Sequence, residues 1–330
     1  MQGKVMSEHS ASSEGAVGID VCKASLDVHI LPANTVLKFA NNKKGHRQLI
    51  TALNGLSIRI ITLESTSKYH RSVHRALHTA GCPVALVNPL RSRLFAEAIG
   101  ALAKTDSVDA RMLATYGQMT RLAATPPLPE ALETLREIVR AREAAVAGTV
   151  VLKNQLAAAT VTCVRRQINR QIKAAERAVE ALKNDALAAI AKDPAMARRL
   201  AVLTSIPGIA EVTAAGLIAN MPELGQLDAK QVGMLAGLAP VACDSGMRNG
   251  PRHIRGGRAV VRTGIYMAAL SAARHNPGLR RFHERLVEAG KANKVALTAV
   301  MRKLLVLANT LLKEDRLWTE QSPIARPFHA

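Results

Sequence analysis

Short runs of apolar, β-branched residues separated by polar turns dominate the first hundred residues of the chain. Four such runs predict strands, at Ala16–Val21, Ser25–Ile30, Ile58–Leu63 and Val84–Val87. Only a short turn separates the first two, which predicts a β-hairpin. Helical patterns lie between the later strands, at Lys44–Leu53 and His70–Ala80. Strands that alternate with helices in this way predict an α/β domain.

The pattern becomes helical after the fourth strand. Asn88–Pro89 breaks the chain before two further predicted helices, at 90–99 and 104–113. Thr125–Pro129 is rich in proline and is the clearest domain boundary in the sequence. Beyond it, residues 130–192 contain one glycine and no proline, a composition typical of long helices.

Within this helical stretch, apolar residues recur at alternating spacings of four and three. They are Ile168, Ile172, Ala175, Val179, Leu182 and Ala186. This is the a/d pattern of paired helices, so it predicts a helical hairpin or a coiled coil. Because fewer than four heptads are visible, two alternatives stay open. The seam can pack on the protein's own body, or it can join two protomers.

Asp193–Pro194 opens a last, mainly α-helical region. Residues 203–219 read as a helix, a tight turn at Pro207 and Gly208, and a second helix, which resembles a helix-hairpin-helix. Such a turn can offer backbone N–H groups to a phosphate, although a purely structural turn is an equal alternative. Two helices are predicted beyond it, at 265–273 and 293–313. The last has a stripe expected in the core: Val295, Val300, Leu304, Leu307 and Leu311.

These patterns predict four segments. They are a disordered leader at 1–15, an α/β domain at 16–125, a helical or coiled-coil segment at 126–194, and a C-terminal domain at 195–330. No run of 18 or more apolar residues occurs, and the amino end lacks a signal-peptide core, so we expect a cytosolic protein without membrane attachment. The four cysteines form no CxxC pair, which argues against structural zinc and disulfides.

The charge points to a polyanionic partner. The 330 residues carry 45 Lys+Arg against 25 Asp+Glu, a net charge of +20. A field of this sign attracts DNA or RNA, and a membrane surface is the weaker alternative. Aromatic residues make up only 2% of the chain, so base stacking cannot be the main mode of binding. Arginine and backbone contacts to phosphate are expected in its place.

Four carboxylates stand out in this basic chain. Asp20 lies within the first predicted strand, and Glu64 directly follows the third. Asp106 and Asp109 are three residues apart and share one face of a helix. Clustered carboxylates repel one another unless a cation lies among them, and their hard oxygens suit Mg²⁺ or Mn²⁺. The set therefore predicts a divalent-metal site for phosphodiester chemistry.

Each acid also has a structural alternative. Asp109 fits a helix cap begun by Thr105 or Asp106, and Glu64 fits a solvated strand end. Any one of them alone would favour that interpretation, and only the joint arrangement favours a metal site. Asp27, on the second predicted strand, is the nearest acid that the set leaves out.

A second candidate site follows residue 237. Residues 245–283 contain eight arginines, no lysine and no acid, which favours bidentate phosphate recognition. Its first five arginines are Arg248, Arg252, Arg255, Arg258 and Arg262. Ser245 precedes them and could attack a phosphate whose developing charge they neutralise. On residues alone, Asp244–Gly246 is ordinary turn chemistry.

The order of strand Asp, strand Glu and helical Asp-x-x-Asp resembles the RuvC-like branch of the ribonuclease H fold. More narrowly, the chain resembles a bacterial insertion-sequence transposase family related to the Piv/MooV DNA invertases, known as bridge-RNA-guided recombinases. The resemblance covers nearly the whole chain after the leader. Its matching segments are Gly18–Val21, Leu63–Thr66, Val87–Pro89, Lys104–Ala110, Pro207–Ile209, Gly237–Pro240 and Ala268–Ala273.

This resemblance implies a function. It implies that Ser245 attacks DNA to form a covalent phosphoserine link, assisted by Mg²⁺ or Mn²⁺ at the four acids. It also implies donor and target DNA, a structured guide RNA, a homo-oligomer (dimer or tetramer) and an active site joined between protomers. A nucleoid-associated recombinase is thus the leading hypothesis. A metal-dependent RuvC-like nuclease that activates water is the alternative, and a basic architectural protein is the third.

Overall fold

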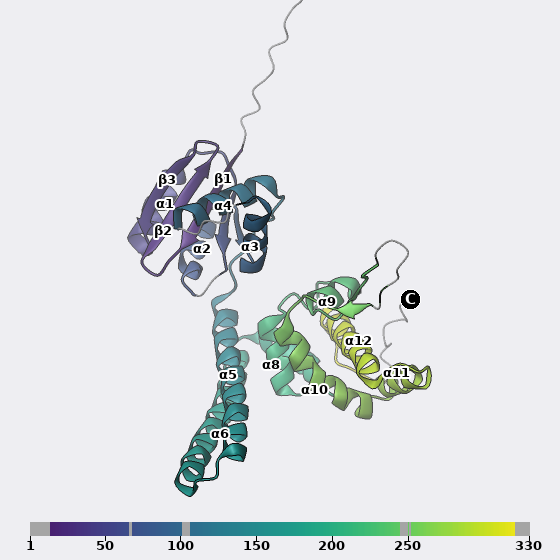
Figure 1. Cartoon of the computed structure of the whole chain (residues 1–330). Helices are drawn as coiled ribbons and strands as arrows, with labels where there is room; N and C mark the ends of the chain where they lie inside the picture. The colour runs from purple at the N-terminus through teal and green to yellow at the C-terminus, as the bar shows by residue number, and fades with distance from the viewer. Residues whose placement is uncertain (1–13, 66–67, 101–105, 245–249, 251, 321–330) are drawn as a thin grey trace, which may run out of the picture. The chain divides into compact units, whose positions relative to one another are not determined.

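The computed structural model describes residues 14–65, 68–100, 106–244, 250 and 252–320. It divides into two compact units, at residues 1–128 and 129–330. The first is α/β and the second mostly helical, as the sequence predicts (Figure 1). The predicted leader at 1–15 falls almost wholly outside the described residues.

The first unit is built on a mixed five-stranded sheet in the order β3-β2-β1-β4-β5. Its strands are β1 (Gly15–Val21), β2 (Ser25–Leu31), β3 (Thr35–Ala40), β4 (Ile58–Glu64) and β5 (Val84–Val87). β1, β2 and β3 pair antiparallel, whereas β4 lies parallel to both β1 and β5. All four predicted strands are confirmed, and β3 is an additional edge strand.

The two faces of this sheet differ in character. One face carries a large apolar cluster that includes Val17, Ile19 and Leu63. It is covered by α1 (Lys43–Leu53) and α2 (His70–Thr79), which add Leu49 and Leu77 to the same cluster. Burial of these side chains is the main source of stability in the unit.

The opposite face carries a smaller apolar cluster of Ala16, Ile60 and Ala85 beside glycine and polar residues, and it is covered by α4 (Asp106–Met119). A Cβ at Gly18 would lie 2.0 Å from the carbonyl oxygen of Ala110, and one at Gly117 would lie 2.4 Å from Thr62 Oγ1. Both glycines therefore let the α4 backbone rest directly on β1 and β4. The remaining helix of the unit, α3 (Pro89–Ala98), begins at Asn88, whose side chain accepts a hydrogen bond from Leu90 N.

The second unit opens with a helical hairpin. Helices α5 (Glu130–Ala158) and α6 (Thr162–Ala191) pack side by side (Figure 1). Three seam residues, Ile168, Ile172 and Ala186, are buried, and the other three are half-buried. The seam thus packs within its own chain, the first of the two alternatives.

Six helices and a two-stranded ribbon complete the second unit among the residues described. They are α7 (Pro194–Thr204), α8 (Glu211–Asn220), α9 (Ala229–Leu235), α10 (Ala259–His275), α11 (Pro277–Glu288), α12 (Asn293–Lys313), β6 (Pro240–Val241) and β7 (His253–Ile254). α12 contacts α7, α9, α10 and α11, and four of its five stripe residues are buried. Val295 is 57% exposed, so its place in the core was wrongly predicted. By length and composition α12 alone, among the described helices, could cross a membrane, but most of it is buried.

Candidate active site

Asp20 and Glu64 lie at the carboxyl ends of two neighbouring parallel strands. β1 and β4 pair with Ile19 opposite Leu63, so the two acids occupy the next position on each strand. Gly18 and Thr62 face α4, as their close contacts require. Because side chains alternate along a strand, Asp20 and Glu64 project to this same face.

Helix α4 carries the other two acids over that face. Ala110, whose carbonyl oxygen approaches Gly18, directly follows Asp109. The close contact therefore joins the segment of α4 next to Asp109 to the strand that holds Asp20. Asp106 lies one turn earlier in the same helix. Its side chain is outside the described residues, and among those described no three His, Cys, Asp or Glu side chains gather to hold a metal.

Ser92 holds the Glu64 carboxylate in place. This serine of α3 is fully buried, and its hydroxyl donates a hydrogen bond to Glu64 Oε1. Asn88 and Pro89 begin the helix, which fixes the position of Ser92 one turn later. Nothing in the sequence assigned a role to Ser92, although the helix start at Asn88–Pro89 was the available signal.

Asp27 adds a further carboxylate beside Asp20. The two residues are direct cross-strand partners on β2 and β1, so they share a face of the sheet. Asp27 is 8% exposed, and its Oδ1 lies 3.0 Å from Lys38 Nζ. Its Oδ2 is buried and has no hydrogen-bond partner among the described residues. Lys38 compensates part of this charge, but the Oδ2 on the face shared with Asp20 remains an oxygen donor of the kind that a hard divalent ion prefers.

His29 lies on the same face of the sheet, opposite Gly18. Burial lowers the pKa of its imidazole, and the charge of Arg111 on α4 lowers it further, although a hydrogen bond to Asn34 opposes both. The ring is therefore neutral near pH 7 and adds no positive charge beneath α4.

The predicted serine site belongs to the second unit. Ser245 and Arg248 lie outside the described residues. The segment that contains them connects β6 to β7, which pair through Pro240 with Ile254 and Val241 with His253. Gly257 closes the base of this hairpin, because a Cβ there would lie 2.1 Å from Gly237 N.

The other predicted arginines fall into two groups. Arg252 and Arg255 are exposed on the hairpin. Arg258 donates to both carboxylate oxygens of Glu223, at 2.6 and 2.7 Å, and to Asn220 O at 2.8 Å. Arg262 donates to Gly256 O at 2.9 Å. Arg258 and Arg262 thus stabilise the protein itself, whatever contact they make with nucleic acid.

The predicted Pro207–Gly208 turn connects α7 to α8. Gly208 has a φ of +104°, and a Cβ there would lie 2.6 Å from Ala272 Cβ on α10. The turn therefore packs tightly against α10, which gives Gly208 a structural reason of its own.

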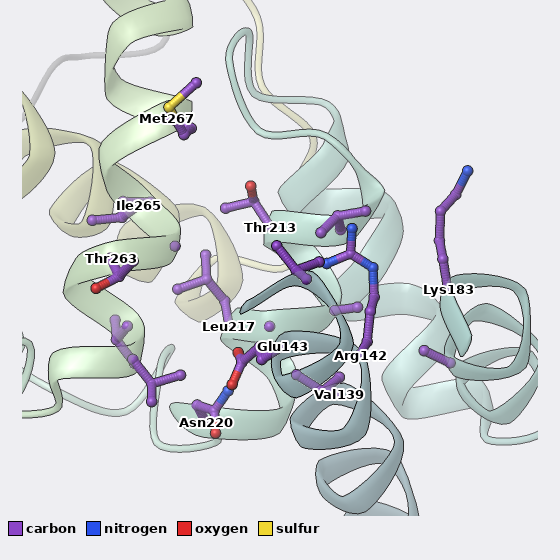
Figure 2. Close-up of a pocket in the computed structure, with 18 of the residues that line it drawn as sticks. Val139, Arg142, Glu143, Lys183, Thr213, Leu217, Asn220, Thr263, Ile265 and Met267 are labelled. Atoms are coloured by element: carbon purple, nitrogen blue, oxygen red, sulfur yellow. The ribbon is translucent and has the colours of Figure 1, made fainter. Parts of the chain in front are cut away.

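A separate cavity of about 620 Å³ lies among α5, α6, α8 and α10 (Figure 2). Its lining is mostly apolar, with Leu217 and Val139 beside the charged residues Arg142, Glu143 and Lys183. Burial raises the pKa of Glu143 above its usual value, although the charges of Arg140 and Arg142 partly oppose this. None of the predicted site residues lines this cavity.

Two family models match the chain and together cover more than half of it. A DEDD-type model described as a transposase matches residues 17–164 and includes all four predicted acids. A second, described as the transposase IS116/IS110/IS902 family, matches residues 200–284 and includes Ser245. A transposase domain of the DEDD type suggests a requirement for divalent metal.

Full-length relatives agree. The chain is 26% identical over 315 residues to the pilin gene-inverting proteins of Moraxella bovis and Moraxella lacunata, across 92% of this chain and 97% of each relative. It is also 26% identical over 178 residues to an insertion element IS110 protein of Streptomyces coelicolor, covering 53% of this chain and 40% of that relative. The chain therefore belongs to the IS116/IS110/IS902 family of bacterial insertion-sequence transposases, and it is a DNA transposase or recombinase.

Proposed function

We propose that this transposase cleaves and rejoins DNA through a phosphoserine link at Ser245, with a divalent cation bound by Asp20, Glu64, Asp106 and Asp109. The observation that best supports the proposal is the joint placement of Asp20 and Glu64 on the α4 face of the sheet. A purely structural role would not require two carboxylates on adjacent strand ends beneath a helix with two more.

The chemistry balances without an external energy source. Ser245 Oγ attacks the scissile phosphorus, so an O–P bond to serine forms as the bond to the leaving deoxyribose oxygen breaks. The serine proton is lost and the leaving oxygen gains one. Attack by another strand's hydroxyl on the phosphoserine then reverses these steps. The bond energy is conserved, which agrees with the absence of a phosphate-binding GxxxxGK[ST] motif from the sequence.

The protein's own groups would supply binding and positioning. A bound Mg²⁺ or Mn²⁺ would stabilise negative charge that develops on the phosphate. Ser92 would orient Glu64 through its hydrogen bond. Arg252 and Arg255, which are exposed and close to Ser245 in the sequence, are the described arginines that would contact the phosphate.

Partner choice rests on family resemblance. The resemblance to this family implies that two or more protomers hold donor and target DNA, and that a structured RNA selects the sequences. The basic charge and the 2% aromatic content agree with recognition of backbone and shape. Sequencing the RNA that stays bound to the purified protein tests whether a structured RNA guides it. Recovery of nothing but a heterogeneous mixture of cellular RNA would contradict this part of the proposal.

A suicide DNA substrate tests the mechanism, because it traps a covalent adduct that cannot religate. The wild type should form the adduct with Mg²⁺, whereas Ser245→Ala should not. Thr263→Ala serves as the hydroxyl control, because Thr263 is exposed on α10, outside the hairpin that carries Ser245. Cleavage without adduct that survives Ser245→Ala would replace the proposal with the water-activating nuclease.

A further inference from the structure

We propose that the outward face of α6 is a binding surface for the sugar-phosphate backbone of duplex DNA. Four basic residues lie along it at spacings of four, three and four: Arg166, Arg170, Lys173 and Arg177. At 3.6 residues per turn these positions fall within a sector of about 60°. The sector lies opposite the apolar seam that packs on α5, so we call it the basic stripe of α6.

The stripe is exposed and uncompensated. All four side chains are exposed, and among the described residues none of them pairs with a carboxylate. The nearby acids are already engaged: Glu176 binds Lys153 at 2.9 Å, and Glu180 binds Lys183 at 2.8 Å. Like charges three and four residues apart destabilise a helix. A polyanion along the stripe would remove that cost.

The shape of the stripe favours a duplex backbone. The eleven helical steps from Arg166 to Arg177 span about 17 Å at 1.5 Å per residue, and duplex DNA carries one charge per roughly 1.7 Å of its axis. No aromatic residue occurs in α6, so the surface lacks the stacking groups that bind single strands. Because the seam packs on α5, the four charged residues stay on the outward face of the helix.

The assignment to DNA rests on the activity of the family. Binding of DNA to the basic stripe would not require Ser245, the four acids or any bound metal. The surface also lies outside the arginine-rich segment at 245–283, so it would be a second region of contact. Contacts of this kind position a protein on DNA without reading its sequence.

The salt dependence of binding tests the stripe. The full-length double variant Arg170→Gln/Lys173→Gln keeps good helix formers at both positions. Its affinity for an unrelated duplex is measured by fluorescence anisotropy, with EDTA, between about 50 and 200 mM salt. Loss of two phosphate contacts should make the slope of log K against log salt shallower by roughly 1.8.

The control is Lys153→Gln/Lys183→Gln, which removes the same charge from the same hairpin at positions already paired with acids. It should keep the wild-type slope, and circular dichroism should show equal helix content in all three proteins. Equal slopes for the stripe variant and the wild type would overturn the proposal. So would a slope change seen with duplex RNA but not with duplex DNA. Because this experiment does not measure cleavage, a negative result would contradict the basic stripe without affecting the phosphoserine proposal. Failure of the phosphoserine proposal would likewise leave the basic stripe unaffected.

Discussion

At the scale of single residues, the site depends on one missing side chain. Gly18 lets the backbone of α4 lie directly on β1, two positions before Asp20. The sequence motif at 18–21 drew attention to the acid, but it is the glycine that fixes how the helix with Asp109 sits. No composition or periodicity signals such a contact, because it depends on where another element packs.

Gly18→Ala should destabilise the protein by about 1–3 kcal/mol, since the new methyl would overlap the α4 backbone. Gly148→Ala is the matched control, because no atom lies within 4 Å of its added Cβ in helix α5. There the change should stabilise by about 0.5–1 kcal/mol. Urea unfolding of both variants checks the pair, and equal effects would contradict the packing.

Ser92→Ala should reduce formation of the DNA adduct by about tenfold or more, as loss of a group that orients a metal ligand does. Ser65→Ala is the control, because the Ser65 hydroxyl donates to Val87 O at 3.2 Å rather than to a carboxylate. Manganese binding measured by electron paramagnetic resonance should weaken in the first variant alone. Unchanged manganese affinity would mean that Ser92 has a packing role only.

The Glu223–Arg258 pair should make stability depend on acid pH. Burial raises the pKa of Glu223, but the hydrogen bonds from Arg258, a backbone hydrogen bond and the charges of Arg258 and Arg136 together outweigh it and hold the pKa below its usual value. A depressed carboxylate stabilises the fold above its unfolded pKa and loses that contribution as pH falls through the folded value. The melting temperature of Arg258→Gln should therefore lie below wild type at about pH 7, and the difference should shrink towards about pH 3. A constant difference would exclude this linkage.

At the scale of elements, the segments with strong hydrophobic periodicity were predicted correctly, whereas the edge strand of the sheet was not. The sequence predicted all the buried strands and the α6 seam, because burial of one face requires apolar residues at regular spacing. These strands are β1, β2, β4 and β5. β3 was missed, since it is an edge strand with Val36 59% exposed. The seven-residue α9 was missed because it is too short to show a helical period. α11 was also missed, although it is amphipathic and begins at Asn276–Pro277, a helix-start signal that the prediction did not use.

The candidate site was harder to predict than the strands that carry it. Strand and helix positions predicted which acids could meet, but the pairing of Asp27 with Asp20 and the hydrogen bond from Ser92 to Glu64 became visible only in the folded structure. The sequence could not separate Arg258, tied to Glu223, from the exposed Arg252 and Arg255 either. Each distinction depends on contacts between segments far apart in the chain.

The seam of the hairpin should carry much of its stability. Ile172 is 7% exposed, so Ile172→Ala should cost about 2–5 kcal/mol. Val164, 45% exposed in the same helix, is the control, and its change to alanine should cost little. Thermal unfolding followed by circular dichroism separates them. Comparable losses would contradict packing of the seam on α5.

At the scale of the whole molecule, binding and chemistry should separate. A charge of +20 attracts DNA through a long-range field, whereas the acids act at short range. Asp20→Asn/Glu64→Gln should therefore abolish the adduct while keeping or strengthening non-specific DNA binding. Adduct formation on the suicide substrate and anisotropy at fixed salt check both halves. Weakened binding would mean that the acids, with their cation, also hold the duplex.

The hairpin of α5 and α6 has a consequence for how this architecture can vary. The chain leaves along one helix and returns along the other, with only residues 159–161 between them. Whole turns added to or removed from both helices in equal number would change the length of the hairpin, here called the arm, while α7 keeps its starting point. The tip is accordingly the natural place to insert a reporter domain, and arm length is a dimension in which relatives can diverge without rebuilding either compact unit.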